Sequence, residues 1–387
     1  EMLRSLVGSE MCIRDSIKTL HVSKIKNTHR LIIIVTFIMI GLFIFTFFNA
    51  SFYQIPIGKI TNIETSHGQK VTDEHHNTDT TYNQRLTIRI LNGKYKNEIT
   101  TVNNHFVKSQ ADSEQFAKNE KVLLHIQKGP SDATILEKKR DGLTVAIVGI
   151  FIVTLLIVGK NVGLQSILSL LFNTAFIIVS IGIHNTFSGT NLFLLMSIAI
   201  ILSTILTLVL VTGWQKRTWV TIVATLSGTF LCVGITELLI QFTGGNGIKY
   251  ETMSFLTLPP KDVFMSSVLI GTLGAVMDVA ITISSGMYEI LQRTPHISMA
   301  RWVLAGRHIG QDIMGTMTNI LLFSYLSGSL AMVLIYLKNA NTFTYTISMN
   351  WSLEMTRALT GGIGIVLTIP ITIGLMVTIF KWKGVSR

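Results

Sequence analysis

Charged residues are scarce in this chain. Only 14% of its 387 residues are Asp, Glu, Lys or Arg, whereas 48% are hydrophobic, and the mean hydropathy is +0.50. Soluble domains carry roughly 25% charged residues. The composition therefore excludes an ordinary soluble protein and predicts an integral membrane protein.

Cysteine is also nearly absent, since the chain has only Cys12 and Cys232. This excludes a disulfide framework and a CxxC metal site. The chain has no phosphate-binding P-loop, HExxH or GxSxG motif. We therefore expect no cofactor, no metal and no enzymatic activity. The polar segment that contains His67, Asp73, Glu74, His75 and His76 lacks the ligand spacing of zinc sites, so it is interpreted as a solvated loop.

Basic residues outnumber acidic ones, and the net charge is +11. The basic residues cluster at the ends of apolar segments, where they orient a membrane protein, so nucleic-acid binding is disfavoured. The expected partner is the lipid bilayer.

The apolar segments predict eight transmembrane helices, because most contain the roughly 17 to 25 residues needed to cross a hydrocarbon core. The second is the shortest, since Lys160 closes it early. The segments are Leu31–Phe48, Leu143–Val158, Leu164–Ile183, Leu192–Val211, Trp219–Phe242, Val263–Gly286, Ile313–Leu337 and Ala358–Phe380.

The Lys and Arg distribution predicts that both termini are cytoplasmic. The short outer loops then hold only Lys249, Lys261, Lys338 and Arg357. The inner set is Lys18, Lys24, Lys26, Arg30, Lys160, Lys216, Arg217, Arg293, Arg301, Arg307, Lys381, Lys383 and Arg387.

Four regions follow from this topology. Residues 1–16 resemble a translated adapter leader and are left out of the fold prediction. Residues 17–49 form the cytoplasmic N-terminus and an anchor helix, 50–141 an extracytoplasmic domain, and 142–387 a seven-helix membrane domain. The anchor could instead be a signal-peptide core, but it is long and no small-x-small cleavage site follows it.

The extracytoplasmic region reads as β structure. Leu86, Ile88 and Ile90 alternate with polar residues, and Asn92-Gly93 suits a two-residue hairpin turn before the next strand, Lys94–Val102. About five short strands are predicted, which is enough for a small OB-like barrel.

The main candidate site is Asp278, a carboxylate inside an apolar segment. Ionisable residues in such segments usually face a helix bundle or a wet cavity. Residues three, four and seven apart share a helix face, and the face of Asp278 is small and polar: Gly271, Gly274, Ala275, Thr282, Ser285 and Glu289. Tight packing, with Asp278 hydrogen-bonded to a neighbouring helix, is the competing interpretation.

A similar polar face is expected on the next helix. It contains Asp312, Gly315, Thr316, Asn319 and Phe323. Asp312 lies at the cytoplasmic start of the span, where the helix dipole and water stabilise a carboxylate. Asn319 is deeper and suited to hydrogen bonding between helices.

These two motifs resemble the YibE/YibF-like family of bacterial membrane proteins. The matching residues are Gly271, Gly274, Ala275, Asp278 and Val279, then Gly306, Ile309, Gly310, Asp312, Ile313, Met314, Gly315, Thr316, Met317 and Asn319. His308 stands where that pattern has an acidic residue. The resemblance implies a bacterial plasma membrane protein and supplies no substrate.

The leading hypothesis is a permease for an ion or small solute. In it, Asp278, Asn319 and Asp312 line a polar pathway between the sixth and seventh helices, together with Gly271, Gly274, Thr282, Gly315 and Thr316. The alternative is a membrane scaffold or accessory subunit that presents the β domain to a protein partner. A remote alternative is an intramembrane aspartyl protease that uses Asp278 and Asp312.

Overall fold

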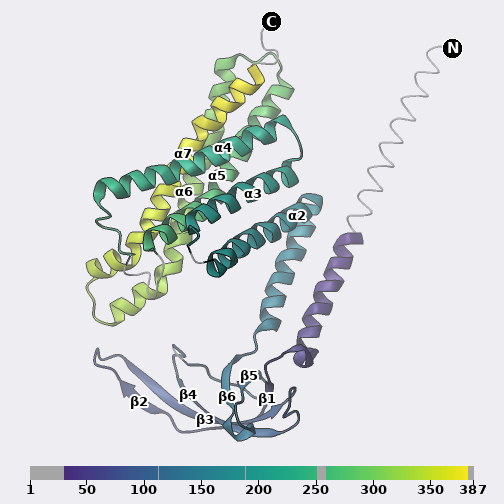
Figure 1. Ribbon diagram of the computed structural model, residues 1–387, viewed down its shortest axis with the longest axis vertical. Coiled ribbons are helices and arrows are strands. Elements are labelled where there is room, and N and C mark those ends of the chain that lie inside the picture. Colours follow the sequence, from purple (N-terminus) through teal and green to yellow (C-terminus); the bar gives the residue numbers. More distant parts are fainter. Residues whose placement is uncertain (1–29, 112, 188, 251–258, 382–387) are drawn as a thin grey trace, which may run out of the picture. The chain divides into compact units, whose positions relative to one another are not determined.

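The computed structural model describes residues 30–111, 113–187, 189–250 and 259–381, so the predicted leader at 1–16 lies outside the described part (Figure 1). The chain divides into two compact units, Glu1–Leu164 and Gln165–Arg387. Each unit is described by itself below.

The first unit begins with a 23-residue apolar helix, Arg30–Phe52. Its last turn is the 3-10 helix η1, Asn49–Phe52. The predicted anchor segment lies within this helix, whose side chains are mostly exposed. Length and composition suit this helix to crossing a membrane.

An antiparallel sheet of six strands follows the helix. The strands have the order β2-β3-β1-β5-β6, and β4 pairs with β3. Their bounds are β1 Ile57–Thr65, β2 Gln69–Thr72, β3 Thr78–Ile90, β4 Ile99–Val107, β5 Lys121–His125 and β6 Thr134–Lys138. No ladder joins β4 to β6 among the described strands, so closure into an OB-like barrel stays a prediction.

The core of the sheet matches the predicted alternation, because Leu86, Ile88 and Ile90 are fully buried. They pack with Ile60, Val102, Phe116, Val122, Leu124 and Ala133. The sequence prediction missed β2, whose four residues are all exposed and largely polar. Such an edge strand has no apolar alternation to reveal it.

The predicted two-residue turn at Asn92-Gly93 is wrong. β3 ends at Ile90 and β4 begins at Ile99, so the connection is longer. Asn92 is buried in this connection. Its Oδ1 accepts from the Ile57 N–H at 2.6 Å, and its Nδ2 donates to the carbonyls of Tyr53 and Ile55. The side chain thereby fixes the entry to β1 instead of only shaping a turn.

A polar cluster ties the two ends of the sheet domain together. The Asp141 carboxylate accepts hydrogen bonds from Lys139 at 2.6 Å, Asn49 at 2.9 Å and Tyr53 at 3.1 Å. Burial, and next the charge of Asp141, raise the pKa of the Tyr53 hydroxyl. The end of the first helix and the beginning of α2 therefore meet at one carboxylate.

The structure has seven helices with the length and composition to cross a membrane in its described part, not the predicted eight. The second and third predicted segments form one 46-residue helix, α2 (Asp141–Thr186), which is interrupted at Lys160. Lys160 has φ 49° and ψ −122°, a conformation that does not belong to a helix. Each arm of α2 is still long enough to cross a bilayer.

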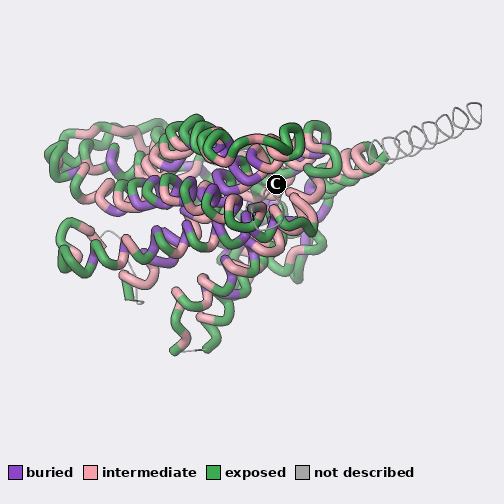
Figure 2. The backbone as a smooth tube through the Cα atoms, turned by 90° about the horizontal axis from the view of Figure 1, so that it is seen from above, coloured by how far each residue is buried: buried purple, intermediate pink, exposed green. Residues whose placement is uncertain are grey.

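Six helical segments make up the second unit, beginning with the second arm of α2. The others are α3 Leu192–Thr212, α4 Lys216–Thr243, α5 Pro260–Arg293, α6 Met299–Lys338 and α7 Phe343–Lys381. α7 packs against α4, α5 and α6. In Figure 2 the buried residues form interrupted stripes along the helices, with exposed turns between them.

Glycines allow α7 to approach its neighbours closely. Gly228 of α4 lies against Thr368, and Gly310 of α6 lies against Ile369. A side chain at Gly364 would come within 3.0 Å of Cys232. Close approach at small residues is typical of helix packing in membranes.

Asn92 provides a test of the sheet domain. Asn92→Ala leaves one buried N–H and two carbonyls without their partner, so we expect a loss of about 2–3 kcal/mol of stability. Limited proteolysis of the sheet domain during denaturant titration measures this loss. Asn103→Ala, at an exposed position in β4, is the control. Equal midpoints for both variants would contradict the role of Asn92.

Candidate functional site

Asp278 lies near the middle of α5, on a face that is exposed in this chain. The opposite face carries fully buried Val276, Val279, Ala280 and Ile283. The Thr282 hydroxyl donates to the backbone carbonyl of Asp278 at 2.7 Å. The side chain of Asp278 thus projects from the side of α5 that is opposite its buried residues.

The predicted polar face of α5 is present and open. Gly274, Asp278, Thr282 and Glu289 are exposed, and Ser285 is half-buried. A side chain added at Gly274 would meet nothing within 4 Å. Gly271 differs, because the Tyr325 hydroxyl of α6 lies directly against it.

The predicted face of α6 is open as well. Asp312, Gly315, Thr316 and Asn319 are all exposed, and Gly315 has no neighbour within 4 Å of an added Cβ. Four buried residues of this helix lie on its other side: Trp302, Gly306, Gly310 and Leu321.

The register between α5 and α6 decides which candidate residues lie at the same level along the two helices. Gly271 contacts Tyr325 and Gly286 contacts Ile309, so α5 and α6 are antiparallel. This register sets Asp278 level with residues about 317–318, which is close to Asn319. Asp312 is level with residue 284, about 9 Å along the helix axis from Asp278 at 1.5 Å per residue. Asp278 and Asn319 are therefore at nearly the same level along the helices, whereas Asp312 is more than one turn away.

Both polar faces point away from α7. A side chain at Gly310 of α6 would meet Ile369 of α7, and one at Gly361 of α7 would come within 3.2 Å of Thr272 on α5. α7 therefore covers one side of the α5–α6 pair. Asp278 and Asn319 border the other side, so the polar residues lie along an open face of the pair instead of being enclosed between the two helices.

The sequence prediction missed a set of buried hydroxyl groups where α4, α5 and α7 meet. The Thr221 and Ser284 hydroxyls are 2.7 Å apart, and Cys232 donates to the carbonyl of Thr360 at 2.9 Å. The set consists of Thr221, Thr225, Thr229, Thr272, Ser284, Thr360, Thr368 and Thr372, all buried. One sequence feature could have revealed this set. The threonines of α4 are spaced three or four residues apart, which places them on one face of the helix.

Most of these hydroxyls donate to carbonyls in their own helix. Thr368 donates to Gly364 and Thr372 donates to Thr368, both at 2.7 Å. Such bonds satisfy a buried hydroxyl without a partner on another helix. Within the described residues, the fully buried Thr225 and Thr229 hydroxyls have no hydrogen-bond partner.

Glu237 and Lys261 join the other ends of α4 and α5 in an ion pair of 2.5 Å. Gln241 also donates to Glu237, at 2.7 Å. Glu237 therefore contributes to helix pairing. Among the described residues, no group of three or more His, Cys, Asp or Glu side chains could hold a metal ion.

A small antiparallel sheet together with long apolar helices defines a helical protein whose composition indicates that it is embedded in a membrane. Residues 147–382 match the YibE/F-like protein family, and residues 51–138 match the YibE/F family N-terminal domain. The chain therefore belongs to the YibE/F-like family. No curated protein and no solved structure matches it.

The two glycines of the α5 face provide a matched test of the register. Gly271→Ala places a methyl group against the Tyr325 hydroxyl, so we expect about 1–3 kcal/mol of destabilisation from overpacking. Gly274→Ala meets open space and should be neutral or slightly stabilising, because Ala is the better helix former. Thermal unfolding of both variants in detergent gives the comparison. Greater damage from the change at Gly274 would contradict the described register.

Proposed function

We propose that this protein is a permease for a cation or small solute, with Asp278 as its intramembrane acidic site. One observation carries the proposal: Asp278 lies on an exposed polar face in the middle of a long apolar helix. An ionised side chain near mid-bilayer costs about 3 kcal/mol or more unless it meets water or polar groups. The open face therefore calls for a wet or polar environment.

The groups around Asp278 suit a small polar cargo. The carboxylate can bind a cation or exchange a proton, and Asn319 supplies an amide at nearly the same level. Thr282 and Thr316 add hydroxyl groups to the same open side. Gly274, one turn before Asp278, leaves space beside the carboxylate.

The register argues against a protease. An aspartyl protease needs two carboxylates that share one site. Asp278 and Asp312 are separated by about 9 Å along the helix axis. We therefore assign separate roles to the two acids and no catalytic role to the pair.

A scaffold function is the second candidate. The sheet domain has its own apolar core and is matched separately by the family N-terminal domain. It could present a surface to a protein partner while the helices serve only as its membrane support. Under this alternative the charge of Asp278 is dispensable.

We place the protein in the bacterial plasma membrane with both termini in the cytoplasm. Support comes from the excess of Lys and Arg in alternate loops. Lys216, Arg293 and Phe380 also line one pocket, which puts the start of α4 and the ends of α5 and α7 at the same end of the second unit. This topology requires both arms of α2 to cross the membrane.

Reporter fusions test the topology. A reporter that is active only outside the cytoplasm should work at Gly93 and Gly245, whereas a cytoplasmic reporter should work at Arg217 and Arg301. The physical reason is that positively charged loops are retained in the cytoplasm. Cytoplasmic activity at Gly93 would overturn the orientation.

Asp278→Asn separates the permease from the scaffold. The substitution removes the charge at nearly constant shape, so a permease should insert normally and lose at least about tenfold of its cation flux. The flux is measured in liposomes that contain a proton- or cation-sensitive dye, with thermal stability measured on the same preparation. Asp132→Asn, at an exposed position in the sheet domain, is the control.

The scaffold alternative expects a different result from the same experiment. Neutralising an unneeded charge should leave function intact and raise stability, because its desolvation cost disappears. Full cation flux through the Asp278→Asn protein would refute the permease role of this residue. Misfolding of the variant alone would identify Asp278 as a structural hydrogen-bonding partner.

A further inference from the structure

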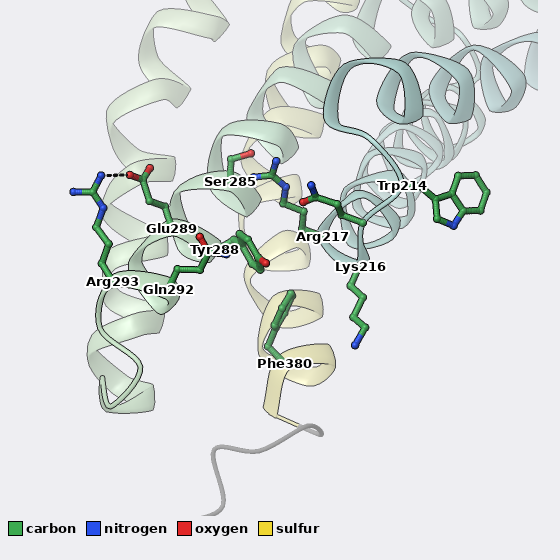
Figure 3. Close-up of a pocket in the computed structure, with 10 residues that line it drawn as sticks. Trp214, Lys216, Arg217, Ser285, Tyr288, Glu289, Gln292, Arg293 and Phe380 are labelled. Carbon is green, nitrogen blue, oxygen red and sulfur yellow. Dashed lines mark hydrogen bonds and ion pairs between the residues drawn. The ribbon is translucent and has the colours of Figure 1, made fainter. Parts of the chain in front are cut away.

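A pocket of about 940 Å³ opens at one end of the second unit, where α4 begins and α5 and α7 end (Figure 3). It continues the polar face of α5 beyond Asp278, because Ser285 and Glu289 line it. The other lining residues are Trp214, Gln215, Lys216, Arg217, Tyr288, Gln292, Arg293 and Phe380. The size of the pocket suits a small organic ion or a lipid headgroup.

Arg217 is the central charge of this pocket. Its guanidinium carbon lies 5.4 Å from the centre of the Tyr288 ring, in a cation–π contact. The Arg217 Nε is buried and has no hydrogen-bond partner within the described chain. In Figure 3 the Arg217 side chain extends toward Ser285 and Tyr288. An arginine held in this way has donors left for a ligand.

The charge of the lining favours an anion. Lys216, Arg217 and Arg293 are basic, whereas Glu289 is the only acidic residue among the lining residues that the structure describes. Glu289 is already paired with Arg293 at 2.6 Å, and Figure 3 shows this pair on the other side of Tyr288 from Arg217. Glu289 is therefore occupied elsewhere, and the Arg217 side of the pocket stays positive.

The backbone adds to this charge. α4 has 28 residues, and its N-cap residue Gln215 makes no side-chain capping bond. The first N–H groups of a helix point outward and carry a partial positive charge, which favours phosphate and carboxylate groups. Arg217 lies in this first turn, so its guanidinium and the helix end act on the same region.

Aromatic side chains are among the lining residues of the pocket. The Tyr288 and Phe380 rings lie 5.6 Å apart, and Trp214 contacts Trp219 at 5.3 Å. Tyr and Trp beside basic residues are typical of the level where a membrane meets water. A phosphate that reaches this level could belong to a lipid or to a soluble molecule.

We propose that this pocket binds the phosphate group of an anionic ligand, with Arg217 as the principal contact. Lys216 and the start of α4 add positive charge, and Tyr288 holds the guanidinium in place. Arg is suited to phosphate because its planar guanidinium can donate two parallel hydrogen bonds. The assignment is independent of transport through Asp278.

The test uses the full chain in a neutral detergent and two probes. Calorimetric titration with inorganic phosphate detects a soluble ligand. Native mass spectrometry after mixing with phosphatidylglycerol or phosphatidylcholine detects a preference for an anionic lipid headgroup. Saturable phosphate binding supports a soluble ligand, whereas selective retention of phosphatidylglycerol without phosphate binding supports a lipid.

Arg217→Gln should weaken whichever interaction is found by about tenfold, the loss expected for one charge-assisted hydrogen bond. Arg301→Gln is the matched control, because Arg301 is exposed on α6 and lies outside the pocket. Arg293→Gln is a second variant at an exposed side chain, so it tests the site even if Arg217→Gln unfolds. It removes one positive charge and releases Glu289, and should weaken binding severalfold.

Three results would overturn the proposal. The first is that the wild-type protein binds neither phosphate nor phosphatidylglycerol selectively. The second is that a folded Arg217→Gln protein, or the Arg293→Gln protein, binds as tightly as wild type. The third is that Arg301→Gln weakens binding as much as the pocket variants do, which would indicate a general charge effect.

Discussion

The close packing of α7 against three other helices is the constraint on which the second unit depends. Apolar surroundings provide little hydrophobic force between helices, so contact area and satisfied polar groups must hold them together. Gly228, Gly310 and Gly364 allow the backbones to approach. Thr368 and Thr372 of α7 donate their hydroxyls to carbonyls of their own helix, so they pack at these contacts without leaving unpaired donors.

This packing explains why the polar faces of α5 and α6 are exposed on the same side of the pair. α7 occupies one side of the α5–α6 pair, and the apolar residues Val279, Ile283 and Leu321 are buried toward it. Asp278 and Asn319 are left on the opposite side. α7 thus positions Asp278 and Asn319 from the opposite side, because it fixes how α5 and α6 are rotated about their axes.

The sequence predicted features that depend on local pattern. Hydropathy located the helices, and spacings of three, four and seven identified the faces of Asp278 and Asp312. Lys160 was predicted to close a helix, and the structure does interrupt α2 at Lys160, where the backbone is not helical. The contact of Tyr325 with Gly271 and the buried hydroxyls of α4 depend on which helices pair, and no single segment encodes that pairing. Asn92 was misread for the same reason, because its partners lie more than thirty residues away.

The cluster at Asp141 has a consequence for how such proteins are assembled. Asn49, Tyr53 and Lys139 all donate to one carboxylate. The first and last residues of the sheet domain therefore lie next to each other. An insertion with adjacent ends imposes little strain on the segments that flank it. The domain can therefore be exchanged, enlarged or removed without changing the spacing of the flanking helices, provided that the two ends remain joined across this carboxylate.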